Sequence, residues 1–161
     1  MGSYYLTKTE NQQGSKIFEE ARQLAEKIND KELLARIQER SGLCYSEMGN
    51  NEKAFSNLFA ALKYYESNNI VKSLPSIYTN IGLLYFEQGL FDKAKLYNEK
   101  VLDISKKENN ISYMMRAYNN LGIIYSREKK FPEALINGYL TIFVEVVGGD
   151  TDNGKKRVFN K

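Results

Sequence analysis

Residues 41–46, Ser-Gly-Leu-Cys-Tyr-Ser, recur as Ile-Gly-Leu-Leu-Tyr-Phe at 81–86 and as Leu-Gly-Ile-Ile-Tyr-Ser at 121–126. The three copies are spaced by 40 residues, and a further column repeats at the same spacing: Ala54, Ala94 and Ala134. Self-similarity at a fixed spacing is the signature of a repeat architecture. Within each copy the glycine and the tyrosine three residues later lie on one face of a helix. The pattern therefore predicts a helical unit repeated three times.

A short turn divides each unit into two helical halves. Gly49 and Gly89 stand where a left-handed C-cap would end the first half, whereas the third copy has Lys129-Lys130 there, which predicts a weaker cap. Pro75 and Pro132 suit the first turn of a helix, where the missing N–H costs nothing. Each unit is therefore predicted to be a pair of antiparallel helices.

The marker glycines lie inside the first helix of each pair. Glycine in a helix interior costs roughly 1 kcal/mol relative to alanine. Its recurrence at Gly42, Gly82 and Gly122 therefore predicts a close helix crossing at which a Cβ atom would clash.

Glycine, tyrosine at +3, alanine at +12 and a second small residue at +19, Ala61 in the first full copy, resemble the tetratricopeptide repeat. The match covers roughly residues 14–138 and departs from the pattern where Val101 and Thr141 replace the second small residue. The resemblance implies an all-α, right-handed solenoid of antiparallel helix pairs. The spacing of 40, against the commoner spacing of about 34, is similar to the long-helix variety found in many bacterial regulators and sensor proteins.

The register predicts a repeat domain at 1–147 and a polar tail at 148–161. The domain divides into a partial repeat and three full ones, at 1–34, 35–74, 75–114 and 115–147. Because Ser15–Lys27 aligns with the second half of the next unit, the chain is expected to begin inside a truncated first-half helix.

Residues 139–147, Tyr-Leu-Thr-Ile-Phe-Val-Glu-Val-Val, are rich in β-branched and aromatic types and taken alone would indicate a strand. Their place in the repeat favours a helix to about Glu145, ended by Gly148-Gly149. No polar capping element is visible after residue 149. Either the tail covers this apolar run, or the native protein continues, or the run meets another chain and forms a homodimer.

Composition argues against several functions. The sequence has no histidine, the commonest general base and metal ligand, so we expect no catalytic residue, metal or cofactor. The single Cys44 occupies the position of Leu84 and Ile124, which favours a core residue over a reactive thiol. The net charge of +3 is dispersed, which favours a solvated surface over a nucleic-acid site. No apolar run approaches the roughly 18 residues of a membrane span. The compartment is left open, with the cytoplasm favoured.

Residues 149–156, Gly-Asp-Thr-Asp-Asn-Gly-Lys-Lys, match the first seven positions of a phosphate-binding loop. The eighth position is Lys156 instead of Ser or Thr, and Asp150 and Asp152 would repel phosphate. The same aspartates hint at a calcium loop, but the chain ends before its terminal glutamate. Both readings are disfavoured against a solvated tail.

The resemblance also implies where a ligand would bind. In the tetratricopeptide family the first-half helices line the concave side, at the residues two and six before each marker glycine. The implied groove is a polar ladder of Arg36, Arg40, Asn80, Arg116 and Asn120, with Ser76 in the remaining position. Asparagine both donates to and accepts from a peptide backbone, and arginine forks onto a carboxylate.

These features favour a scaffold or ligand-sensing module that binds a protein partner through an extended peptide or C-terminal carboxylate. Two alternatives stay open. The concave face could be solvated without a dedicated ligand, or the chain could be a structural spacer that self-associates through 139–147.

Overall fold

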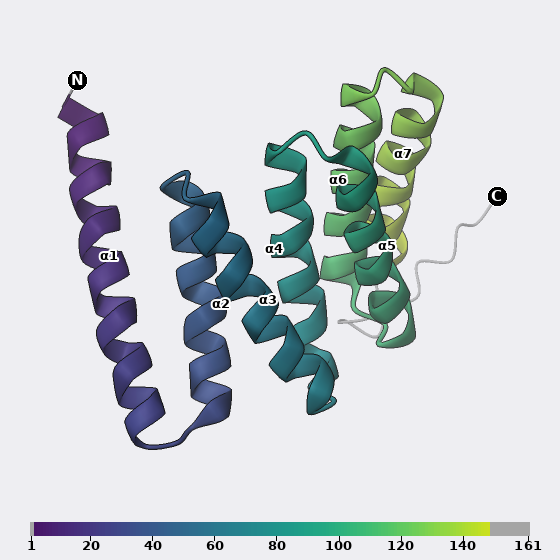
Figure 1. Cartoon of the computed structure of the whole chain (residues 1–161). Helices are drawn as coiled ribbons and strands as arrows, with labels where there is room; N and C mark the ends of the chain where they lie inside the picture. The colour runs from purple at the N-terminus through teal and green to yellow at the C-terminus, as the bar shows by residue number, and fades with distance from the viewer. Residues whose placement is uncertain (1, 149–161) are drawn as a thin grey trace.

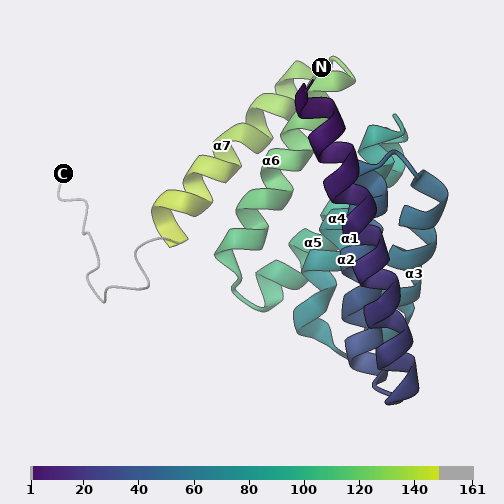
Figure 2. The ribbon, with the colours of Figure 1, turned by 90° about the vertical axis from the view of Figure 1, so that its left-hand side faces the viewer.

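The computed structural model of the chain describes residues 2–148. Over that range the chain forms α1 (Gly2–Lys27), α2 (Lys31–Glu47), α3 (Asn51–Ser67), η1 (Val71–Ser73), α4 (Leu74–Glu87), α5 (Phe91–Lys107), α6 (Ile111–Arg127) and α7 (Phe131–Gly148). The helix pairs are stacked from α1 at one end to α7 at the other (Figure 1), and in the view turned by 90° α1 is nearest the viewer (Figure 2). The predicted all-α solenoid of antiparallel helix pairs is confirmed.

Each connection between consecutive α-helices contains one residue in the left-handed region. These residues are Asn29 (φ 56°), Gly49 (73°), Asn69 (53°), Gly89 (71°), Asn109 (54°) and Lys129 (60°). The predicted left-handed caps at Gly49 and Gly89 are confirmed. The asparagines between pairs are also spaced by 40 residues, and asparagine adopts this conformation more readily than most residues. Lysine does so at a cost of roughly 1–2 kcal/mol. The third turn has the same left-handed conformation at Lys129, and its weaker cap stays a prediction.

Side-chain caps set the starts of three helices. Asp30, Asn50 and Asn110 each accept a hydrogen bond from the backbone N–H three residues ahead, at 2.9, 3.2 and 3.2 Å. Helices α2 and α6 accordingly begin at Lys31 and Ile111, four residues before the boundaries expected at 35 and 115. The middle pair opens instead with η1, followed by Pro75 in the first turn of α4.

The N-terminal end differs from the sequence expectation. The sequence predicts a truncated first-half helix, then a turn, then a second-half helix. Residues 2–27 instead form one continuous helix, α1, without a turn. Thr9 stands at the position of Gly49 and Gly89. A β-branched residue is poorly suited to the left-handed conformation that such a turn requires, and the helix runs through it.

The marker glycines lie where paired helices approach closely, to different degrees. A Cβ built on Gly42 would lie 2.7 Å from Leu58 Cγ and 3.2 Å from the Ala54 carbonyl oxygen. On Gly82 it would lie 3.0 Å from Asn98 Nδ2, and on Gly122 its nearest neighbour is 3.4 Å away. The predicted close crossing is therefore tight in the first two pairs and looser in the third.

The core lies within and between the helix pairs and thins toward the C-terminal end. Ala54 and Ala94 are fully buried, whereas Ala134 is only half-buried because no helix packs beyond α7 among the described residues. Residues 139–147 lie in α7, so the predicted helix is confirmed over the predicted strand alternative. Most large apolar side chains of α7 are more than half exposed: Phe131, Leu135, Ile136, Tyr139, Ile142, Phe143 and Val146.

Substituting the marker glycines tests the crossing. Gly42→Ala should lower the free energy of unfolding by about 1–3 kcal/mol, because the methyl group overpacks against the buried Leu58. Gly122→Ala is the matched control, since its Cβ meets only ordinary contacts and alanine favours the helix by up to about 1 kcal/mol. Urea unfolding followed by circular dichroism measures both, and equal effects would contradict the difference between the crossings.

Candidate functional site

The first-half helices α2, α4 and α6 each present three side chains on one face. They are the residues six before, two before and one after the marker glycine, a spacing of i, i+4 and i+7. The stripes are Arg36, Arg40 and Leu43 on α2; Ser76, Asn80 and Leu83 on α4; and Arg116, Asn120 and Ile123 on α6. Helices α2 and α4 contact each other, as do α4 and α6. The stripes therefore form three rows across the solenoid. The first row is Arg36, Ser76 and Arg116, the middle row is Arg40, Asn80 and Asn120, and the aliphatic row is Leu43, Leu83 and Ile123.

Most of the predicted ladder lines a single groove of about 720 Å³. Arg36, Arg40, Asn80 and Arg116 all line it, together with Ser76. Further lining side chains come from α1, from Tyr65 of α3 and from Lys72 of η1. The volume lies within the range of roughly 300–1,000 Å³ typical of ligand sites.

The carboxylate of Glu39 organises this groove. It accepts hydrogen bonds from the Tyr65 hydroxyl at 3.0 Å, the Ser76 hydroxyl at 2.7 Å and the Asn80 amide at 3.2 Å. These donors come from α3 and α4, so one side chain of α2 joins two consecutive pairs. Because one N–H of Asn80 is held by Glu39, the orientation of this amide toward the groove is fixed before any ligand binds.

Burial keeps Tyr65 a donor. Its side chain is 1% exposed. That burial raises the pKa of Tyr65 well above its usual range, and the neighbouring Glu39 carboxylate adds to the shift. The phenol therefore stays protonated at physiological pH and continues to donate to Glu39.

The groove carries more positive than negative charge. Four cationic side chains line it, Arg36, Arg40, Lys72 and Arg116, against the carboxylates of Glu32 and Glu39. The three guanidinium side chains are exposed, while the hydrogen-bonded Glu39 is half-buried. Such an excess attracts anionic ligands, and exposed guanidinium groups suit carboxylates.

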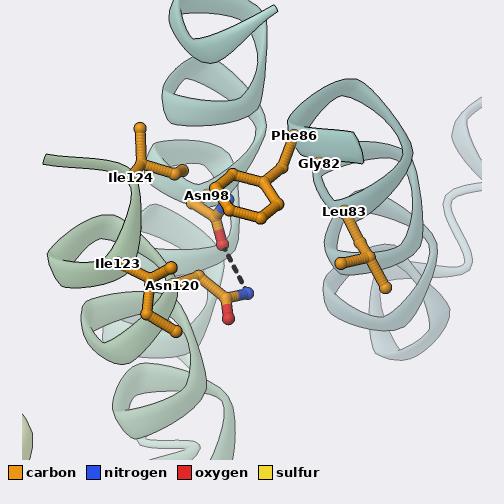
Figure 3. A pocket seen from close by; sticks show the side chains of 7 residues that line it. All are labelled: Gly82, Leu83, Phe86, Asn98, Asn120, Ile123 and Ile124. Carbon is orange, nitrogen blue, oxygen red and sulfur yellow. Dashed lines mark hydrogen bonds between the residues drawn. The ribbon is translucent and has the colours of Figure 1, made fainter. Parts of the chain in front are cut away.

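Asn120, the fifth predicted residue, faces an adjoining and smaller cavity. Its amide donates to Asn98 Oδ1 at 3.0 Å, as the dashed line in Figure 3 shows. Asn98 is 1% exposed and donates in turn to the Ala94 carbonyl at 2.8 Å. The cavity measures about 70 Å³ and is lined by Gly82, Leu83, Phe86, Asn98, Asn120, Ile123 and Ile124. The ladder is thus divided between two cavities that share α4 and α6.

Sequence reasoning overlooked two parts of this surface. The aliphatic row could have been found by extending each predicted stripe one helical turn past the marker glycine, to Leu43, Leu83 and Ile123. Glu39 had no such signal, because its bonds reach residues 26, 37 and 41 positions away. Only the fold brings these groups together.

Other candidate sites have weaker support. Cys44 is half-buried on α2, unlike the buried Leu84 and Ile124, and burial raises the pKa of its thiol. Within residues 2–148, no group of Cys, Asp or Glu side chains is arranged to hold a metal, and no helix is long and apolar enough to cross a membrane. The phosphate-loop and calcium-loop matches at 149–156, like all but the first residue of the expected tail, lie outside the described residues.

Helix α7 presents a second surface. Four of its positions are apolar where the corresponding positions of α5 are charged: Leu135, Tyr139, Phe143 and Val146 replace Lys95, Glu99, Asp103 and Lys106. Leu135, Tyr139 and Ile142 line an open hollow of about 710 Å³ between α6 and α7. We refer to the exposed apolar residues of α7 as the α7 face.

Comparison with known proteins supports the helical repeat. Residues 73–138 match the sequence model of the tetratricopeptide repeat family, which confirms the resemblance stated above. A comparison with curated proteins finds no match.

Solved structures that share the fold include the following two. BtubC (BKLC) from P. vanneervenii superposes with a TM-score of 0.76 at 18% identity, over 91% of this chain and 61% of that one. Aspartyl phosphate phosphatase F from Bacillus subtilis gives a TM-score of 0.62 at 20% identity, over 88% of this chain and 46% of that one. The present chain therefore spans less than two thirds of either structure, and the likeness concerns the fold alone.

Removing the Glu39 carboxylate tests its organising role. Glu39→Ala should lower the free energy of unfolding by about 1–3 kcal/mol, because the buried Tyr65 hydroxyl loses its acceptor. Glu39→Gln, which keeps an acceptor oxygen, should cost less. The exposed Glu32→Ala in the same groove should stay within about 0.5 kcal/mol of the parent. Urea unfolding of the three variants measures this, and a Glu39→Ala effect no larger than that of Glu32→Ala would refute the assignment.

Proposed function

We propose that this chain is a protein-interaction scaffold that holds an extended, acidic peptide segment of a partner in the groove across α2, α4 and α6. The observation that carries the proposal is the convergence of Arg36, Arg40 and Arg116, from two helices, on one groove of about 720 Å³. The helical repeat fold, which is typical of protein-interaction scaffolds, supports it.

The chemistry divides between charge and backbone recognition. Each arginine can fork onto a side-chain carboxylate or a C-terminal carboxylate of the ligand. Asn80, oriented by Glu39, is placed to exchange hydrogen bonds with the ligand backbone. Charge-assisted hydrogen bonds contribute about 1.5–3 kcal/mol when well ordered. The exposure of these arginines reduces that value, so we expect modest, salt-sensitive affinity.

We propose binding without catalysis. One structural neighbour is named as an aspartyl phosphate phosphatase, but this chain matches 46% of that structure at 20% identity. The sequence has no histidine, the commonest general base, and the likeness concerns the fold alone, so we transfer no activity from that name.

Neutralising the groove tests the proposal. The triple variant Arg36→Gln, Arg40→Gln and Arg116→Gln should weaken binding of a labelled peptide of alternating glutamate and serine by roughly tenfold or more, because forked ion pairs are lost. Fluorescence anisotropy measures the affinity, and circular dichroism should show unchanged helicity. Raising the salt concentration should weaken peptide binding strongly for the parent protein and only slightly for the triple variant.

A charge-matched variant controls for net charge. Lys63→Gln, Lys107→Gln and Lys129→Gln remove the same charge from exposed positions outside the groove lining. Equal weakening by both triple variants would mean that the attraction is general, and the groove assignment would fall.

A second candidate function is self-association through the α7 face. In the second pair the corresponding ridge is charged, and Lys95 pairs with Glu128, the residue directly after α6, at 3.0 Å. In α7 the ridge is apolar and exposed, with Tyr139 at 64% and Phe143 at 61%. An apolar face of this kind favours burial against another chain, here a second copy, in a structural spacer.

Light scattering tests this second candidate. The parent chain should show a mass that rises with concentration, and Tyr139→Glu with Phe143→Glu should return it to a monomer by charging the contact. Leu90→Glu with Leu96→Glu, also apolar and exposed, is the matched control and should not alter association. A parent chain that stays monomeric at high concentration would eliminate the spacer.

A further inference from the structure

We infer that the groove selects a peptide in which acidic and small aliphatic residues alternate, with an aliphatic side chain entering the cavity beneath Leu83 and Ile123. This inference rests on the proposed function and specifies its ligand. It is carried by the aliphatic row and its cavity, which the proposed function does not use.

The rows on the two sides of the middle row differ in chemistry. Arg36 and Arg116 bound one side of the middle row, and Leu43, Leu83 and Ile123 bound the other. On α6, Arg116 and Ile123 are seven residues apart, which corresponds to about 10 Å along the helix. A ligand lying along the middle row therefore meets cations on one side and apolar surface on the other.

The cavity shown in Figure 3 suits an uncharged side chain. Leu83 on α4 and Ile123 on α6 stand on opposite sides of it, and both are nearly half exposed, at 47% and 44%. Its polar lining is the Asn98–Asn120 amide pair, whose members already bond to each other. A charge placed there would lack a counter-charge, whereas an aliphatic group would contact Phe86 and Ile124.

The absence of a side chain on Gly82 contributes to this space. Gly82 lines the cavity, and a Cβ there would approach Asn98 Nδ2 to 3.0 Å. The volume of about 70 Å³ is roughly half of the ~150 Å³ that holds a benzene molecule in an apolar cavity. A side chain the size of valine fits this space, and a large aromatic ring does not.

Extended backbone matches the two rows. Successive side chains of a strand point to opposite sides. A strand running over Asn80 and Asn120 can therefore direct acidic residues toward the arginines and aliphatic residues toward Leu83 and Ile123. A peptide with all its acidic residues first and all its aliphatic residues second cannot satisfy both rows along its length.

Three labelled peptides test the inference by fluorescence anisotropy on the intact chain. The first alternates glutamate and valine, the second has the same composition in two blocks, and the third alternates glutamate and serine. The first should bind roughly tenfold more tightly than the third, because one or more valine side chains leave water. The first should also bind more tightly than the second. Equal affinities in either comparison would overturn the inference.

Matched variants locate the effect. Leu83→Gln should remove most of the preference for valine over serine, while Leu96→Gln, an equally exposed leucine of α5 outside the cavity, should keep it. Both positions are surface-exposed, and circular dichroism verifies that both variants fold. If both variants keep the preference, or both lose it, the cavity is not the site.

The outcomes separate the two levels of the proposal. If the glutamate–serine peptide binds and the triple arginine variant weakens it, while valine adds nothing, the alternating motif is wrong and the proposed function stands. If no glutamate peptide binds, the proposed function itself fails.

Discussion

The close approach of the two helices within each pair is the constraint on which the rest of the structure depends. It is tightest where Gly42 leaves no room between its own backbone and the buried Leu58. A fixed approach fixes the rotation of each first-half helix about its axis. Because the marker glycine faces the second helix of its pair in α2, α4 and α6 alike, residues at equivalent positions fall into rows. The groove is a consequence of this packing, since its lining residues need only occupy the outward side of helices that the glycines have already oriented.

Between the pairs, polar side chains add directional hydrogen bonds to the apolar packing. Leu58, Ile77 and Ile81 contribute buried apolar side chains to the core. Glu39 adds directional contacts, because it accepts hydrogen bonds from one donor on α3 and two on α4 at once. The same contact that aligns the first two pairs also presents Asn80 to the groove. Stability and recognition therefore share one carboxylate, and a change at Glu39 affects both.

The sequence predicted the parts of the structure that repeat. Glycine, tyrosine and alanine at intervals of 40 residues were sufficient for the helix pairs and the C-caps at Gly49 and Gly89. The face that carries the arginines was implied only by the resemblance to the tetratricopeptide family. The sequence did not predict what depends on one copy alone. The unbroken α1 follows from Thr9 in place of a turn glycine, and the Glu39 contacts join segments far apart in the chain. The diversion of Asn120 toward Asn98 follows from an asparagine at the position of Leu58 in the preceding pair.

The left-handed residues in the connections have a consequence for how such a chain can change length. Because Asn29, Asn69 and Asn109 adopt the same left-handed conformation, a segment that begins after one and ends at the next contains one helix pair, and the segment after Asn69 also contains η1. Duplicating or excising such a unit preserves the phase of every helix around it. Inserting one residue within a helix instead turns everything beyond it by about 100°. Growth and loss by whole units are thus the changes that this architecture tolerates best, and each added unit would lengthen the groove by one stripe.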